Sequence, residues 1–229
     1  VKDVSGNNLT AGVVSGFGTD VEIVMPTEGL LLHYTFDNVI GNTVYSEVGD
    51  YNGTLTDSAQ VNVDGHHGNS IITAGNQDYG SFVGNGEEFD TLLDYTYSFW
   101  IKPTTFTNLG LIGYGHNTIL IYIDNTTTMY VSNAGTQSGP SSTELTNTMI
   151  LNEWNHIAIR RTSGKLEILV SDLILNTNSD NPTALGKENA SKTLVGGPTT
   201  NYSEALYDTV RLYNRALSQE EISALANEQ

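Results

Sequence analysis

Carboxylate pairs are the first side chains to consider, because two acids on one face of a strand can cleave glycosidic bonds. A retaining mechanism needs carboxyl groups about 5–5.5 Å apart. In the segment LEILVSD, Glu167 and Asp172 are an odd number of residues apart, so a strand would place them on opposite faces. The acids of NGEEFD, which are Glu87, Glu88 and Asp90, indicate an acidic turn. Neither segment predicts a catalytic pair.

Histidine and cysteine chemistry is equally limited. His66 and His67 lie in the glycine-rich turn GHHGN, without a third metal ligand nearby in the sequence. Cysteine is absent, which excludes disulfides, thiol catalysis and Cys-ligated zinc. No Ser-His-Asp or metal-hydrolase motif is visible. We therefore expect that the protein is not an enzyme.

Aromatic and polar residues on the expected strands favour a binding role. In YTYSFWIKP, strand alternation places Trp100 opposite Phe99, and in TILIYID it separates Tyr122 from the isoleucines. In WNHIAIRR, His156 and Arg160 share a face. If the aliphatic faces form the core, the other surface of one sheet is lined by Trp100, Tyr122, His156 and Arg160. Aromatic faces with hydrogen-bonding neighbours suit sugar rings, so this surface is a candidate glycan site.

A loop offers a second candidate site. The segment GYGHN contributes Tyr114, His116 and Asn117, and loops often carry recognition residues. Ordinary turn chemistry is the alternative explanation for these three residues.

The elements that must position these residues are mainly strands. About a dozen β-branched or aromatic segments alternate with connectors that are dense in Gly, Asn and Asp. This pattern predicts an all-β fold, a two-sheet antiparallel jelly-roll β-sandwich. One short helix is expected at the C-terminal end. There, Ser218 and Glu221 have the spacing of a capping box, and Leu217 and Ile222 that of a hydrophobic staple.

Composition limits the partners. The 229 residues suffice for one large domain, and we expect residues 1–28 to be an arm or an added strand and residues 29–229 to be the sandwich. The net charge of −17 makes nucleic acid an unfavourable partner and suits an extracellular medium. No apolar run approaches the roughly 20 residues that span a bilayer, so membrane insertion is not expected. The first residue is Val rather than Met, so we expect a processed product or a piece of a longer protein.

An ordered set of segments carries a family resemblance. The segments are LLHYTFD, YNGTL, GHHGNSIITAGNQDYGSFV, YTYSFWIKP, LNEWNHIAI, GKLEILVSD and YDTVRLYNRALSQEEI. In this order they resemble the laminin-G-like jelly-roll domain of the concanavalin A-like lectin/glucanase superfamily, from Gly29 to Leu225. The sequence departs from the usual pattern of the family at Arg160 and Arg161. It also lacks the Glu-x-Asp-x-x-Glu motif of the glucanase members. Trp100 and Trp154 match aromatic positions of the family, so packing is an alternative role for them.

The resemblance also implies a metal site. Its fold brings the first and last family strands together, and many members have a structural calcium ion at such a place. Asp37 ends the first of these strands and Asp208 begins the last. Because Ca²⁺ prefers several oxygen ligands, these two acids are the candidate ligands of a structural Ca²⁺. Alternatively, Asp37 caps a turn and Asp208 is a solvated acid.

Taken together, these features predict a non-catalytic carbohydrate-binding or adhesion module. We expect a glycan or polysaccharide partner, and a larger extracellular, cell-surface or virion-surface assembly around the module. A purely structural interaction module, such as a virion decoration, fibre or adhesin stalk, is the alternative. A glycoside hydrolase with an unrecognised site is the third hypothesis, since fold alone does not fix function.

Overall fold

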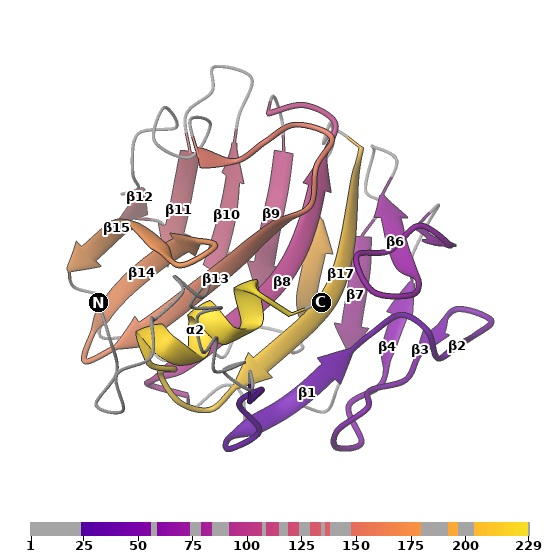
Figure 1. Ribbon diagram of the computed structural model, residues 1–229, viewed down its shortest axis with the longest axis horizontal. Coiled ribbons are helices and arrows are strands. Elements are labelled where there is room, and N and C mark those ends of the chain that lie inside the picture. The colour runs from indigo at the N-terminus through magenta and orange to yellow at the C-terminus, as the bar shows by residue number, and fades with distance from the viewer. Residues whose placement is uncertain are drawn as a thin grey trace, which may run out of the picture.

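The computed structural model describes residues 24–55, 59–73, 79–83, 92–106, 109–114, 119–123, 129–133, 136–137, 148–179, 192–196 and 204–228. These residues form two antiparallel β-sheets that pack face to face, with one short helix (Figure 1). The expected jelly-roll-type sandwich is therefore confirmed. Most of the expected N-terminal arm lies outside the described residues.

The eight-stranded sheet contains the three longest of the described strands. Its order along the sheet is β15-β14-β13-β8-β17-β6-β5, and β1 also pairs with β17. The bounds are β1 (Leu30–Tyr34), β5 (Gln60–Asn62), β6 (Ser70–Thr73), β8 (Tyr95–Pro103), β13 (Asn155–Thr162), β14 (Lys165–Val170), β15 (Leu173–Ser179) and β17 (Ala205–Tyr213). The first part of β17 pairs with β6 and its last part with β1, so the last strand joins the N-terminal strand to the centre of the sheet.

The nine-stranded sheet lies behind it in Figure 1. Its order is β12-β11-β10-β9-β16-β7-β4-β3-β2. The bounds are β2 (Val39–Ile40), β3 (Thr43–Val44), β4 (Gly53–Leu55), β7 (Tyr79–Val83), β9 (Leu109–Tyr114), β10 (Ile119–Ile123), β11 (Met129–Asn133), β12 (Thr136–Gln137) and β16 (Lys192–Gly196).

The main core fills the space between the two sheets. Alternate residues of the central strands point into it, as the strand period of two requires. On β8 these are Tyr97, Phe99 and Ile101. On β17 they are Tyr207 before the irregularity at Asp208 and Leu212 after it. The intervening residues, Trp100 among them, therefore face outward from the sandwich.

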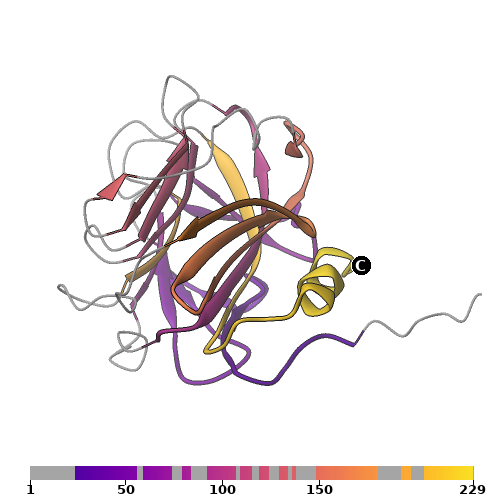
Figure 2. The ribbon, with the colours of Figure 1, turned by 90° about the vertical axis from the view of Figure 1, so that its left-hand side faces the viewer.

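A second, smaller core covers part of this outward face. Helix α2 (Gln219–Ala226) packs Ile222 and Leu225 against Ala158, Leu169 and Tyr213 of the eight-stranded sheet. Figure 2 shows the helix on the side of that sheet that is turned away from the nine-stranded sheet. The expected helix is thus present, and it covers a face of the sheet rather than only an edge.

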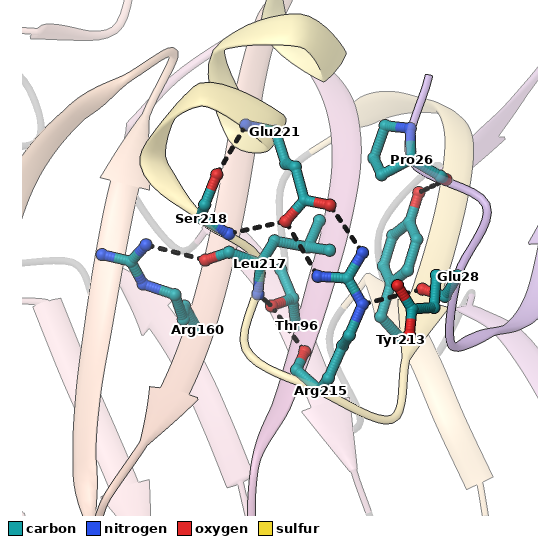
Figure 3. A network of polar contacts seen from close by, with 9 residues as sticks. All are labelled: Pro26, Glu28, Thr96, Arg160, Tyr213, Arg215, Leu217, Ser218 and Glu221. Atoms are coloured by element: carbon teal, nitrogen blue, oxygen red, sulfur yellow. Dashed lines mark hydrogen bonds and ion pairs between the residues drawn. The ribbon is translucent and has the colours of Figure 1, made fainter. Parts of the chain in front are cut away.

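The start of the helix is fixed by the expected capping box. The Glu221 N–H donates to Ser218 Oγ at 3.2 Å, and the Ser218 N–H donates to Glu221 Oε2 at 2.8 Å. Arg215 forms a bidentate ion pair with the same Glu221 and donates to the Glu28 carbonyl (Figure 3). Arg160 donates to the Leu217 carbonyl just before the helix. The polar network therefore ties the helix to the sheet and to the N-terminal segment.

Among the described residues, the structure has no helix of the length and apolar character needed to cross a membrane.

Candidate functional site

Three residues form a row across the outward face of the eight-stranded sheet, beside the helix. Trp100 on β8 is in register with His156 on β13 and with Asp208 on β17. Their outward direction follows from strand alternation, because the preceding or following residues belong to the main core. Each of the three is buried, so something must cover the row.

The cover is the turn 64–69, between β5 and β6. The His66 ring stacks on the Trp100 ring, with centroids 3.6 Å apart and planes 12° apart. The His67 N–H donates to Asp208 Oδ2 at 2.8 Å. The other oxygen of Asp208 accepts the Thr209 N–H at 2.6 Å, at an irregularity of β17 where Thr209 has a positive φ of 50°. The buried acid therefore fixes the turn on the sheet.

Asp37 fixes the same turn from its other end. Asp37 Oδ1 accepts the Asn69 N–H at 2.8 Å. Gly68 has a φ of +62°, and a Cβ at this position would lie 2.4 Å from Asp37 Oδ1. Only glycine combines this backbone conformation with so close an approach of the carboxylate. The turn is consequently held by two carboxylates, one within β17 and one in the segment that follows β1.

A second turn, 150–155, lies next to the first and is fixed independently. The Asn155 side chain accepts the Ile150 N–H at 2.8 Å and donates to the carbonyls of Ile150 and Glu153 at 2.9 and 2.7 Å. Asn152 donates its N–H to the Pro103 carbonyl, which links the turn to the end of β8. The turn presents Trp154, which is half-buried, to the first turn.

The two turns meet through aromatic rings. The rings of His66 and Trp154 lie edge to face, with centroids 6.1 Å apart and planes at 78°. We call His66, Trp100 and Trp154 the aromatic corner. His66 and Trp154 are half-buried, whereas Trp100 is 7% exposed and forms its floor. The corner contains both tryptophans of the chain.

The ionisation of the neighbouring groups follows from their burial. Burial lowers the pKa of His156 and of His33 to about 4, and the positive charge of Arg211 lowers the pKa of His33 further. Burial and the nearby His67 lower the pKa of His66 to about 4. A neutral His66 ring agrees with the 3.0 Å contact between the Nδ1 atoms of His66 and His67, because one of the two nitrogens must donate a proton and the other must accept it.

Asp208 is shifted in the opposite direction. Burial raises its pKa to about 6, although the His67 and Thr209 N–H groups favour the ionised form. At neutral pH the group is thus a buried carboxylate that is stabilised by backbone donors rather than by a neighbouring cation.

The four residues predicted to share a surface are separated in the structure. Trp100, His156 and Arg160 lie on the eight-stranded sheet, but Tyr122 belongs to β10 of the nine-stranded sheet. The prediction of one common surface is therefore wrong for Tyr122, because strand alternation gives the face of a strand and not its sheet. His156 is fully buried and bonds Ser98 Oγ at 2.8 Å through Nε2. These contacts favour the packing role for Trp100 and His156.

Arg160 has structural partners. It donates to Glu167 Oε2 at 2.6 Å and to the Leu217 carbonyl at 2.9 Å, so its charge stabilises the strand pair and the helix start. Of the loop candidate, Tyr114 ends β9, while His116 and Asn117 lie outside the described residues.

The candidate calcium ligands occupy different positions from those expected. Asp208 is the fourth residue of β17 and is fully buried, so the alternative of a solvated acid at the strand start is wrong. Both acids accept backbone N–H groups of the turn 64–69. Within the described part of the chain, no three His, Asp or Glu side chains gather in a metal-binding arrangement. The two carboxylates are thus better described as acceptors that fix the backbone of the turn than as ligands of an ion. Calcium binding stays a prediction.

Sequence reasoning missed the pairing of His66 with Trp154. The sequence shows His66 only as half of a histidine pair, and Trp154 only as a match to an aromatic position of the family. No periodicity links two turns that are distant in the chain, so only the fold brings the rings together.

Comparison with known proteins places this geometry in context. The model of the concanavalin A-like lectin/glucanases superfamily matches residues 74–223. None of the curated proteins matches the sequence.

Several solved structures share the fold at low sequence identity. A Trypanosoma rangeli sialidase superposes with a TM-score of 0.67 and 17% identity, over 88% of this chain and 33% of the sialidase chain. The chain therefore spans about one third of that relative. Domain 4 of AbnA, a GH43 extracellular arabinanase from Geobacillus stearothermophilus in complex with arabinotriose, gives a TM-score of 0.65 and 19% identity, over 86% of this chain and 98% of that domain.

A third relative is a binding domain. That of Paraclostridial Mosquitocidal Protein 1 gives a TM-score of 0.65 and 20% identity, over 87% of this chain and 52% of that one. At these identities the likeness shows the fold alone. Together, the two-sheet architecture and the matched residues show that the chain belongs to the concanavalin A-like lectin/glucanase superfamily.

Proposed function

We propose that the protein is a non-catalytic carbohydrate-binding module within a larger extracellular assembly, with adhesion as its broader role. The observation that carries the proposal is the aromatic corner, in which two independently fixed turns present half-buried rings. A preorganised aromatic surface suits a sugar, because the C–H face of the sugar stacks on the ring and little ordering is required on binding. The AbnA domain, 98% of which superposes on this chain, supports the proposal since it is described in complex with arabinotriose.

The non-catalytic part of the proposal is supported by the engagement of the acids. On the outward face, Glu167, Glu221 and Glu228 each form an ion pair with an arginine. Asp208 accepts two backbone N–H groups. A glycosidase needs one carboxyl group free to donate a proton and another free to attack or to activate water. These four acids serve as structural acceptors and are therefore poorly suited to either step.

A structural interaction module is the second candidate, and exposed apolar residues at the sheet edges favour it. Leu173 and Ile174, on the edge strand β15, are 55% and 41% exposed. An edge strand with apolar side chains can pair with another chain. Such a module would serve a fibre, an adhesin stalk or a virion surface.

A glycan array with the folded protein tests the proposal. We expect saturable binding to a small group of related glycans, lost on heat unfolding. Incubation with the bound glycans should release no new reducing ends. Absence of binding to every glycan, together with concentration-dependent self-assembly, would favour the structural module. Release of reducing ends would contradict the non-catalytic role.

A further inference from the structure

We infer that the aromatic corner is the ligand site and that it takes an uncharged sugar unit rather than a sugar acid. This inference rests on the proposed function and adds the place of binding and the class of glycan. Its basis is the environment of the rings and the state of every arginine in the chain.

Of the three rings of the aromatic corner, only His66 and Trp154 are accessible to a ligand. The His66 ring stacks on the outward face of the Trp100 ring, so a ligand cannot reach that face. Trp154 contacts His66 through an edge-to-face arrangement, which leaves area of both half-buried side chains open to solvent. A sugar would therefore stack against Trp154, with the edge of the imidazole beside it as a hydrogen-bonding group.

Recognition of a sugar carboxylate normally uses arginine, because the planar guanidinium donates two parallel hydrogen bonds. The chain has four arginines, and all four are already bound within the protein. Three are paired with carboxylates, and Arg161 donates to the Leu93 carbonyl. Freeing any of them would break a hydrogen bond or ion pair within the protein. The arginines are therefore unavailable to an acidic sugar.

The charges closest in sequence to the rings also disfavour an anion. Glu153 precedes Trp154, and Asp64 lies two residues before His66; both acids are exposed. Lys102 is a cation on the same sheet face as Trp100, two residues further along β8. Two exposed acids outweigh the one lysine near the rings, and the whole chain has a net charge of −17. The electrostatic field at the aromatic corner therefore repels an anionic glycan. An uncharged pentose or hexose unit avoids this repulsion, and its hydroxyls can donate to the acids.

The test measures affinity for neutral and acidic oligosaccharides in parallel. The neutral probes are arabinotriose, xylotetraose and mannotetraose, and the acidic probes are sialyllactose and trigalacturonic acid. Binding is followed by tryptophan fluorescence, since both tryptophans of the chain are in the corner, and by calorimetry, which does not depend on the site. We expect at least one neutral probe to bind and neither acidic probe to do so.

Variants then place the site. We expect Trp154→Ala to weaken the neutral probe at least about tenfold, because the stacking surface is lost. Trp154→Phe should retain part of the affinity, and Leu173→Ala, at an exposed apolar position on β15, should leave it unchanged. Lys102→Met should have no effect on the neutral probe. Each variant is first checked for wild-type melting behaviour, and Trp154→Phe serves if the alanine variant does not fold.

The outcomes separate this inference from the proposed function. Calorimetric binding of a neutral probe that Trp154→Ala and Trp154→Phe both leave unchanged would overturn the site but not the function. Binding of sialyllactose or trigalacturonic acid that Lys102→Met removes would overturn the neutral class. No binding of any probe and no hit on the glycan array would overturn both.

Discussion

Acidification should destabilise the protein through two histidines on the outward face of the eight-stranded sheet, the buried His156 and the half-buried His33. His33 and His156 have pKa values near 4 in the folded protein, whereas an unfolded histidine titrates near 6.5. Since the folded pKa is the lower one, the stabilising contribution is complete above about pH 6.5 and is lost as the pH falls toward 4. The unfolded chain takes up protons in this window and the folded chain does not.

The magnitude follows from the two pKa values. Between pH 7 and pH 5, each of these histidines should lower the free energy of unfolding by about 2 kcal/mol. His66 is left out of this figure because it is half exposed. Asp208 acts in the opposite direction, since its pKa is raised from 3.8 to about 6 and protonation of the folded state becomes favourable below pH 6. Its gain of about 1 kcal/mol by pH 5 leaves a net loss of about 3 kcal/mol.

The assay is equilibrium urea unfolding at pH 7 and pH 5, followed by tryptophan fluorescence. The variant His156→Gln removes one titrating group from the cluster. It will also lose packing, so the informative quantity is the difference between pH 7 and pH 5 for each protein and not the stability at either pH. We expect this difference to be about 2 kcal/mol smaller in the variant. Equal differences in both proteins would refute the account of the buried, neutral histidine.

Three further predictions concern the turn 64–69 and the helix. Asp208→Ala should lower the free energy of unfolding by about 2 kcal/mol or more, because the half-buried His67 and the buried Thr209 lose the acceptor of their N–H groups, whereas Asp37→Ala should lower it by about 1 kcal/mol. Urea unfolding that ranks the two variants in the reverse order would contradict the role of Asp208 as the stronger clamp. Ser218→Ala should lower the free energy of unfolding by about 0.5–2 kcal/mol through loss of the cap, and Ser223→Ala in the same helix should leave it nearly unchanged. Equal stabilities of the two variants would mean that the helix is not docked on the sheet. If Asp37 and Asp208 share a calcium ion, EDTA should lower the melting temperature, and calcium but not magnesium should restore it. Asp208→Asn should abolish this response. An unchanged melting temperature in EDTA would rule the calcium site out.

Local patterns were sufficient for much of the fold. The capping box around Ser218 and the alternation of YTYSFWIKP depend on residues a few positions apart, so both were predictable and both are present. The core faces of β8 and β13 followed from the same alternation. Which sheet a strand joins depends on long-range pairing, and for this reason Tyr122 was placed on the wrong surface.

The candidate site shows the same limit. Asp208 looked like an acid at a strand start, but β17 begins three residues earlier and the turn 64–69 covers it. Its burial is a property of two segments that are far apart in the chain. The aromatic corner also depends on two distant turns. The turn 64–69 has the Gly, Asn and Asp residues that are typical of turns, and the turn 150–155 has only its two Asn residues. Sequence reasoning therefore found the elements of the site but not their assembly.

The most direct test of the central claim is an NMR titration of the two tryptophan indole N–H resonances. Nitrogen-15 labelling gives one such resonance each for Trp100 and Trp154, and Trp154→Phe assigns them. With the neutral oligosaccharide that binds best, we predict a saturable shift of the Trp154 resonance and a smaller one for the buried Trp100. A glycan that binds by calorimetry but leaves both resonances unmoved would contradict the account.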